Sequence, residues 1–369
     1  MGAVSDLVRR EPVLIASALL ALASFALVPP SPAVMDHVDL EVVCILFCFM
    51  VSVAGMAGCG VFGRIAHRMV MATGGVGTLC TVLVLLPFLC SMFVTNDVAL
   101  ITFVPLTMTV LRLTGLDRLT VPVLVLQTVG ANLGSMLTPF GNPQNLFIHS
   151  RYSVGGADFV MEMLPLVVAG GVVLFLATAM LGRGGIEPRM EGTGEVSDVR
   201  FMWASAGMFA LCIATVLGAV PLWILLVAVL AVTLLMSPRT LLRVDYGLLL
   251  TFLFLFVFTG NVSEVGQVSS ALGGLMSWDP VVTSVVASQF ISNVPAAIML
   301  SGFTEDWAGL LAGVNIGGFG TPIASMASLI TLRFYMASDG HDTRGYMVWF
   351  TAANVVMLLV LLPVSYLVR

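Results

Sequence analysis

Apolar segments long enough to cross a membrane recur along the whole chain. An α-helix needs about 20 predominantly apolar residues to cross roughly 30 Å of hydrocarbon. On this basis we predict nine spanning helices, at 12–29, 38–57, 119–148, 160–181, 201–218, 219–237, 245–262, 307–335 and 346–367. Two further apolar stretches, 72–112 and 280–303, each contain a polar break near the middle. Each of these is either a pair of crossings or a re-entrant hairpin that enters and leaves on the same side.

The composition fits a chain immersed in lipid. Of the 369 residues, 59% are hydrophobic and only 9% are charged, and the mean hydropathy is +1.07. These values exclude a soluble globular domain. Arg9 and Arg10 followed by a long apolar run resemble a secretory signal, but the run favours a first spanning helix. We therefore predict an all-α polytopic membrane protein.

The arginines indicate the orientation. The sequence has no lysine and 15 arginines. If the N-terminus is cytoplasmic and both interrupted stretches are hairpins, 13 arginines lie inside and only Arg151 and Arg369 lie outside, as the positive-inside rule requires. A single crossing at either stretch would destroy this bias. Two crossings would keep it, but the arms of 280–303 are too short to span. We expect a multi-pass protein of the cell membrane.

Three sequence blocks occur twice in the same order. "VDLEVV" at 38 is echoed by "VDYGLL" at 244, "FVTNDVALI" at 93 by "FISNVPAAI" at 290, and "ANLGSMLTPFGN" at 131 by "VNIGGFGTPIAS" at 314. With the arginine count, this predicts an inverted-topology repeat, an architecture common in secondary transporters.

The repeat divides the chain into four parts. Residues 1–37 form a first transmembrane helix. Residues 38–182 form the first repeat, with an inward hairpin at about 72–112 and a broken helix at about 119–148. Residues 183–200 form a cytoplasmic connector, and residues 201–369 form the second repeat, with an outward hairpin at about 280–303 and a broken helix at about 307–335.

The hairpin tips and helix breaks carry the candidate site. Lipid cannot satisfy a tip's backbone groups, so a tip must be buried in protein or line a watery cavity. The tip residues are Thr95, Asn96, Asp97, Ser292 and Asn293. Glycines and prolines should unwind the two broken helices, and the freed carbonyls and polar side chains suit Na⁺. The break residues are Asn132, Thr138, Gly141, Asn142, Asn315, Thr321, Pro322 and Ser325.

These four elements predict one central site. We assign anion binding to the tips with Thr138, Thr321 and Pro322, and cation binding or coupling to Asn96, Asp97 and Asn293 with Asn132, Gly141, Asn142, Asn315, Thr321 and Ser325. Na⁺ would bind at the two tips. Any one element alone is as easily a kink or a cap, but four elements in register favour a site.

Other polar residues have plainer interpretations. Gln127, Gln289 and Asn354 are predicted to form interhelical hydrogen bonds, and His67, His149 and His341 to be loop residues without partners. The six cysteines are predicted to be reduced, packed thiols.

At "TNDVALITFVP", "GANLGSMLTPFGNPQNL", "SNVPAAIMLSGFT" and "GVNIGGFGTPIASMASLI", the chain resembles the ion transporter superfamily. This group holds citrate-transporter-like permeases, divalent anion:Na⁺ symporters, arsenite permeases and a class of Na⁺/H⁺ antiporters. The resemblance implies an elevator-type, usually dimeric carrier. The dicarboxylate symporters read Ser-Asn-Thr at each tip, whereas here the third residue is Asp97 or Val294. An acid at this position is more similar to the arsenite-permease and antiporter branches.

Asp97 is the most informative residue, because an intramembrane carboxylate is costly and marks a functional site by default. It could bind a coupling proton, join a cation site, cap a helix or repel certain substrates. The leading hypothesis is a secondary carrier of a small anion, a carboxylate such as citrate or an inorganic oxyanion, coupled to Na⁺ or H⁺. The alternatives are a Na⁺/H⁺ antiporter, an arsenite-type efflux permease and an anion channel.

We expect no enzyme activity, because the chain has neither a phosphate-binding loop with lysine nor a nucleophile paired with a base. No cofactor beyond the coupling ion and no nucleic-acid partner are expected. The expected partners are the anion, membrane lipid and a second copy of the chain.

Overall fold

The computed structural model describes residues 12–29, 38–182, 197–216, 218–338 and 340–368. Most of the predicted connector and parts of the predicted first unit lie outside these ranges, as do Arg9, Arg10, Arg183, Arg189 and Arg369. Every assigned element of regular secondary structure in the described residues is a helix. Six of these helices, α3, α6, α9, α10, α12 and α18, are long and apolar enough to cross a membrane. The prediction of an all-helical, polytopic membrane protein is confirmed.

The first part of the chain contains the described helices α2 to α11, together with the short 3₁₀ helices η2 and η3. After α2 (Pro12–Ser24), the chain forms α3 (Leu40–Gly58), α4 (Val61–Met71), α5 (Val76–Cys90), α6 (Asn96–Leu113), the short 3₁₀ helix η2 (Asp117–Leu119), α7 (Thr120–Ser135), α8 (Pro143–Arg151) and α9 (Gly156–Ala179). Then α10 (Val199–Val216), α11 (Leu222–Met236) and η3 (Pro238–Arg243) follow.

The helix order of α3 to α9 recurs in the last part of the chain. It runs through α12 (Tyr246–Ser263), α13 (Gly266–Trp278), α14 (Pro280–Ile291), α15 (Asn293–Ser301), α16 (Trp307–Ile316), η4 (Pro322–Ala324), α17 (Met326–Met336) and α18 (Thr343–Val368). The two interrupted stretches are each two helices, α5 with α6 and α14 with α15. The two predicted broken helices are α7 with α8 and α16 with α17. The sequence did not predict the short helices α4 and α13.

Matching sequence blocks adopt matching local structures. Asp39 and Asp245 are the N-cap residues of α3 and α12, with φ and ψ of −78° and 85° in the first and −79° and 86° in the second. Each carboxylate accepts a hydrogen bond from the backbone N–H three residues later, at 3.0 Å from Val42 and 2.9 Å from Leu248. This is the N-cap arrangement that satisfies an otherwise unpaired helix donor.

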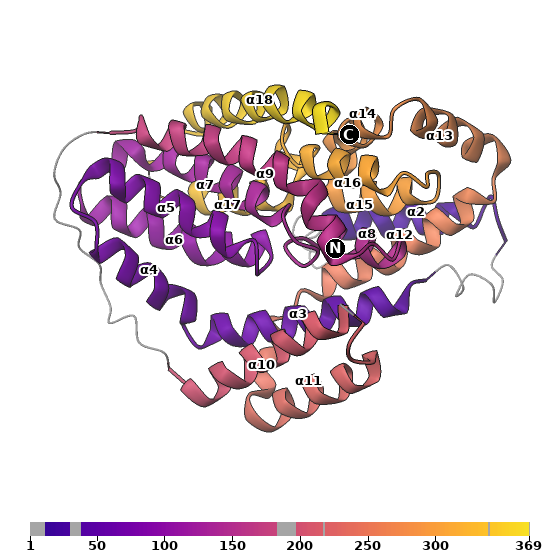
Figure 1. The fold of residues 1–369 in the computed structure, drawn as a ribbon, viewed down its shortest axis with the longest axis horizontal. Helices are drawn as coiled ribbons and strands as arrows, with labels where there is room; N and C mark the ends of the chain where they lie inside the picture. The colour runs from indigo at the N-terminus through magenta and orange to yellow at the C-terminus, as the bar shows by residue number, and fades with distance from the viewer. Residues whose placement is uncertain (1–11, 30–37, 183–196, 217, 339, 369) are drawn as a thin grey trace, which may run out of the picture.

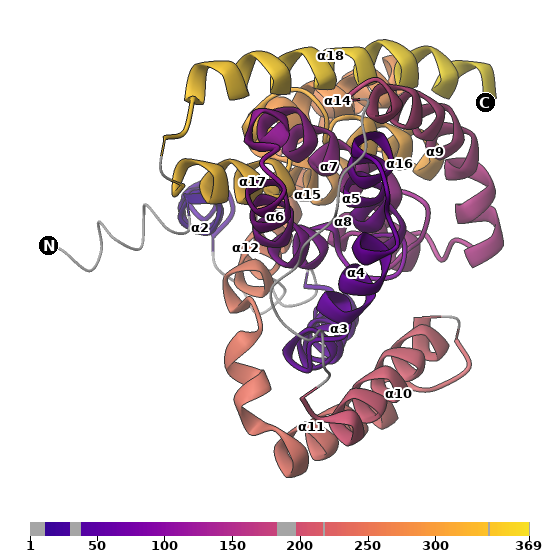
Figure 2. The same ribbon diagram turned by 90° about the vertical axis from the view of Figure 1, so that its left-hand side faces the viewer.

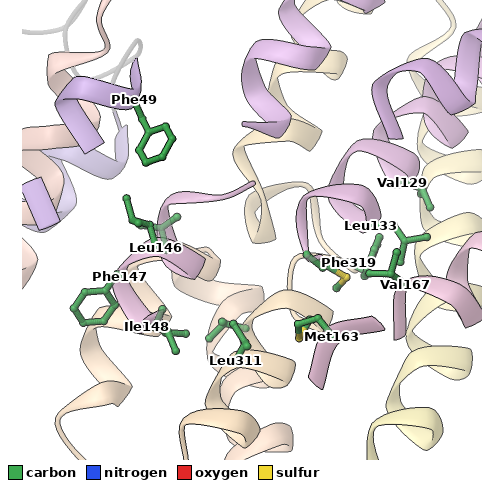
Figure 3. Packing of buried hydrophobic residues seen from close by; sticks show 14 of the residues in the cluster. Phe49, Val129, Leu133, Leu146, Phe147, Ile148, Met163, Val167, Leu311 and Phe319 are labelled. Carbon is green, nitrogen blue, oxygen red and sulfur yellow. The ribbon is translucent and has the colours of Figure 1, made fainter. Parts of the chain in front are cut away.

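The helices of the two halves interlock. Within each half, α5 packs on α7 and α14 packs on α16. Across the halves, α6 packs on α17 and α15 packs on α8, so each hairpin contacts the broken helix of the other half. Residues from both halves share one buried cluster, including Leu133, Met163, Leu311 and Phe319 (Figure 3).

Helices α2, α3, α10, α11 and α12 form a second group beside the hairpins and broken helices. Helices α10 and α11 pack on α3, and α2 packs on α12. In both views α18 lies on the opposite side of the molecule from α10 and α11 (Figures 1 and 2). The hairpins and broken helices therefore lie between α18 and the layer formed by α3, α10 and α11.

Candidate functional site

The first tip lies between α5 and α6. Thr95 is the extended N-cap residue of α6, and Asn96 begins the helix as a buried residue. The Asn96 side chain accepts a hydrogen bond from the backbone N–H of Asp97 at 2.9 Å, and its amide nitrogen donates to Oδ1 of Asn132 at 2.9 Å. The backbone N–H of Asn96 donates to the carbonyl of Gly141 at 3.3 Å. The first tip is thus joined to the break between α7 and α8.

The second tip repeats part of this geometry. The side chain of Asn293 accepts from the backbone N–H of Val294 at 3.0 Å, as Asn96 does from Asp97. Ser292 differs from Thr95, because it has φ of 73° and ψ of 156°. This backbone conformation is nearly restricted to glycine and costs on the order of 1–3 kcal/mol in other residues. Strain of this kind concentrates at functional sites.

Asn145 holds the break between α7 and α8 together. Its amide nitrogen donates to the carbonyls of Ser135 and Thr138, at 3.0 and 3.1 Å. Asn142 donates to the hydroxyl of Ser135 at 2.5 Å. A Cβ on Gly141 would overlap the backbone of Ser135, so the break needs glycine there. Sequence reasoning missed Asn145, although its position in the first turn of α8, within "NPQN", is a signal.

Gln289 makes the corresponding hydrogen bonds in the second break, between α16 and α17. Its amide nitrogen donates to the carbonyls of Gly317 and Phe319 at 2.9 and 3.0 Å, and its Oε1 accepts from the backbone N–H of Thr321 at 2.9 Å. The predicted interhelical bonds of Gln289 are confirmed. So are those of Gln127, which donates to Leu83 and Thr107, and of Asn354, which accepts from Gly320.

Two threonines that were predicted to bind the anion, Thr138 and Thr321, donate their hydroxyl hydrogen bonds to backbone carbonyls. The hydroxyl of Thr138 donates to the carbonyl of Met92 at 2.6 Å, and that of Thr321 donates to the carbonyl of Gln289 at 2.9 Å. Both bonds attach a break to a hairpin. Thr321 is exposed and Pro322, which begins η4, is half-buried.

Asparagines and a serine connect the two halves at the centre. Oδ1 of Asn132 accepts from Asn96 and also from the hydroxyl of Ser325 at 3.0 Å. On the other side, the amide nitrogen of Asn315 donates to Oδ1 of Asn145 at 2.7 Å. The structure therefore brings Asn96, Asn132 and Ser325 together in one chain of contacts.

The two equivalent asparagines differ in one respect. Oδ1 of Asn132 accepts two hydrogen bonds, whereas Oδ1 of Asn315 is buried without a hydrogen-bond partner. Oδ1 of Asp97 is also buried without a partner. An unsatisfied buried polar atom costs about 1–3 kcal/mol, so each is a place where a ligand would relieve the cost.

A cavity of about 160 Å³ adjoins the first tip. Its polar and charged lining consists of Thr95, Asp97, Asn142, Arg243 and Asp245. First-turn residues of four helices line it: Asp97 of α6, Pro143 of α8, Leu248 of α12 and Met326 of α17. A smaller cavity, of about 30 Å³, reaches Ser292 and Val294 of the second tip.

The donor atoms at the tips are hard oxygens. In the described part of the chain, no group of three or more His, Cys, Asp or Glu side chains could hold a metal ion. Amide, hydroxyl, carbonyl and carboxylate oxygens suit an alkali cation better than a transition metal.

Comparison with known proteins fits this arrangement. A family model described as "Citrate transporter" matches residues 3–306. The chain is 35% identical over 289 residues to "Uncharacterized transporter MJ0456" of Methanocaldococcus jannaschii, covering 76% of each protein. It is 32% identical over 317 residues to "Inner membrane protein YbiR" of Escherichia coli, covering 82% of this chain and 81% of the relative. The chain belongs to the citrate transporter family. It is a membrane transporter of the citrate and anion permease type.

The family match spans both tips and the first break, and ends just before α16. A more distant relative is "Silicon efflux transporter LSI3" of Oryza sativa, which is 31% identical over 146 residues, 39% of this chain and 29% of the relative.

The interpretation of the histidines as loop residues without partners is wrong. His67 lies within α4, and Nδ1 of His341 lies 3.0 Å from the carbonyl oxygen of Ser338. His149 is not a loop residue, because it lies buried in the last turn of α8 with its ring edge-on to Phe159, at a centroid distance of 6.3 Å. The apolar pattern of α8 stops before His149, which is why the helix was expected to end at 148. The six cysteines are free, as predicted.

Proposed function

We propose that the chain is a secondary active carrier that moves a small anion, either a carboxylate or an inorganic oxyanion, coupled to Na⁺ or H⁺. The observation that carries the proposal is that the first tip meets the breaks of both halves through Asn96, Asn132 and Ser325. A site built from both halves of a repeat is the arrangement from which alternating access arises.

The anion would bind where helix N-termini converge. Four helices present their first turns to the 160 Å³ cavity, and a helix N-terminus carries unpaired N–H groups and partial positive charge. Asn142 and Thr95 add polar side chains to the same wall. These features favour an oxyanion or a carboxylate.

The coupling cation would bind at the oxygens left without partners. Asp97 lines the cavity and Oδ1 of Asn315 lies in the second half of the site, and both lack a hydrogen-bond partner. A proton on Asp97, or Na⁺ at either group, would satisfy them. No other cofactor is part of the proposal.

In the proposed cycle, α3, α10, α11 and α12 form the stationary part. The two re-entrant hairpins, the two broken helices, α9 and α18 move as one body in an elevator-type step. The cavity supports this division, because residues of α3 and α12 form one wall and the first tip forms the other. The proposal includes a homodimer in the cell membrane with a cytoplasmic N-terminus.

The test is a thermal-shift screen of purified protein followed by uptake into proteoliposomes. A ligand of the folded state raises its apparent stability, so citrate, succinate, sulfate, phosphate or arsenite should raise the melting temperature. The stabilising anion should then enter under a Na⁺ or H⁺ gradient, saturably and with counterflow. Asn96→Ala and Asn293→Ala should each reduce uptake, and full uptake in both variants would contradict the site.

A second candidate is a cation/H⁺ antiporter or an efflux permease. The observation that favours it is the presence of two carboxylates, Asp97 and Asp245, on the same cavity. Proton-driven Na⁺ movement without any external anion would identify this function.

A further inference from the structure

Asp245 faces both tips from the opposite wall. It lines the larger cavity beside the first tip and the smaller cavity beside the second, and no other ionisable residue in the described ranges lines both. Its Oδ1 accepts the hydrogen bond that caps α12. Oδ2 takes no part in that bond, and the side chain is exposed.

Three ionisable residues line the larger cavity: Asp97, Arg243 and Asp245. The guanidinium of Arg243 lies over Gly58, where a Cβ would overlap Nη1, at the carboxyl end of α3. A helix carboxyl end attracts a cation, so Arg243 has a local reason for its position. No ion pair in the described residues joins it to either acid.

Both carboxylates line the same cavity of about 160 Å³, Asp97 from the first turn of α6 and Asp245 from the N-cap of α12. Oδ1 of Asp97 is also buried without a hydrogen-bond partner. Two like charges near one cavity repel unless a cation lies with them.

We propose that Asp245 is a cation-binding residue of the transport cycle and that, together with Asp97, it attracts one monovalent cation into the cavity beside the first tip. The inference rests on the proposed function, which places the coupling cation at Asp97 or Asn315 and gives Asp245 no role in binding it. It adds a ligand from the stationary part of the molecule.

The chain supplies a matched control in Asp39. Asp39 caps α3 with the same backbone angles and the same hydrogen bond as Asp245 caps α12. It lines a different cavity, beside Arg151 and Phe147, which reaches neither tip. Asparagine is as good an N-cap residue as aspartate. Asp245→Asn and Asp39→Asn therefore remove the same charge from equivalent caps.

The experiment measures the charge of the cavity directly. In a variant without the six native cysteines, a cysteine replaces Val98, which lines the cavity. The rates of its modification by a cationic and an anionic methanethiosulfonate are measured in choline chloride, and their ratio is divided by the same ratio for a free thiol. Ile101, also in the lining, supplies a second position.

The parent ratio should favour the cationic reagent. Asp245→Asn should lower the ratio roughly threefold to tenfold, the scale expected for one charge a few ångströms to a nanometre away. Asp39→Asn and Asp245→Glu should leave it unchanged. Replacing choline by Na⁺, or lowering the pH from 8 to 6, should lower the ratio in the parent but not in Asp245→Asn.

Equal ratios in Asp245→Asn and Asp39→Asn would overturn the proposal, as would a parent ratio that responds to neither Na⁺ nor pH. The assay needs no transport, so a chain that moves no anion could still show this cation site. A failure of the proposed function is thereby distinguishable from a failure of this inference.

Discussion

At the residue scale, two side-chain amides satisfy the backbone carbonyls where the helices break. Asn145 and Gln289 lie at different positions of their halves, yet each donates to two carbonyls that a break has freed. Backbone carbonyls that are shielded from water need such a partner. A break is therefore stable only where such a side chain is available.

Asn145→Ala should lower stability more than Gln144→Ala. The first change leaves the carbonyls of Ser135 and Thr138 and the amide of Asn315 without their partner, at about 1–3 kcal/mol for each unsatisfied group. Gln144 is equally buried, but neither amide atom has a hydrogen-bond partner. Melting temperatures in detergent measure the difference. A larger loss for Gln144→Ala would show that the bonds of Asn145 do not stabilise the break.

Ser292→Gly should raise the melting temperature, because glycine tolerates the backbone conformation that strains Ser292, worth about 1 kcal/mol or more. Thr95→Gly is the control, since Thr95 has φ of −64° and carries no such strain. There glycine should cost about 0.5–1 kcal/mol. The account of Ser292 fails if both variants are destabilised alike.

At the element scale, the sequence predicted the helices that a hydropathy window can detect. Five of the six long apolar helices, α3, α9, α10, α12 and α18, match predicted spans, because each is a run of about 20 apolar residues. The sixth, α6, lies in the stretch 72–112 that was predicted to form a hairpin. Helices α4 and α13, with 11 and 13 residues, were not predicted because they are too short to span a membrane. They occupy the same place in the helix order, directly after α3 and α12. The partners of Asn145 and Gln289 could not be predicted, because their bonds depend on how distant helices pack.

Close packing of α5 on α7 requires a small residue at Gly134. A Cβ there would overlap the carbonyl oxygen of Phe88, so Gly134→Ala should cost about 1–3 kcal/mol through overpacking. Gly207 in α10 has open space beside it, because a Cβ there would meet no atom within 4 Å. Gly207→Ala should be neutral or stabilising by up to about 1 kcal/mol. Thermal unfolding of both variants decides, and equal stability of the two would contradict the packing argument.

At the scale of the whole molecule, the two halves differ in the contacts of two corresponding tyrosines. Tyr152 and Tyr335 fall in the same register as Asn132 and Asn315. The Tyr152 hydroxyl donates to the carbonyls of Ser301 and Thr304 at 3.0 and 2.8 Å. Burial raises the pKa of Tyr152 to about 12, so the hydroxyl remains a donor at neutral pH. Tyr335 instead accepts from the backbone of Asp342 and borders a cavity of about 590 Å³.

Tyr152→Phe should therefore destabilise the described state, by about 0.5–1.5 kcal/mol for each lost hydrogen bond. Tyr335→Phe removes only the bond from Asp342 and should cost less. The comparison of melting temperatures requires both proteins in the same detergent. An equal loss would indicate that the two ends of the molecule are closed to the same degree.

The central claim is that Asp97 couples an ion to anion movement. The most direct measurement is the initial rate of uptake of the stabilising anion into proteoliposomes, recorded against Na⁺ concentration and pH for the parent and for Asp97→Asn. The account predicts a saturable, ion-dependent rate in the parent and no dependence on Na⁺ or pH in Asp97→Asn, which should still insert into the membrane. An ion dependence that is the same in both proteins would contradict it.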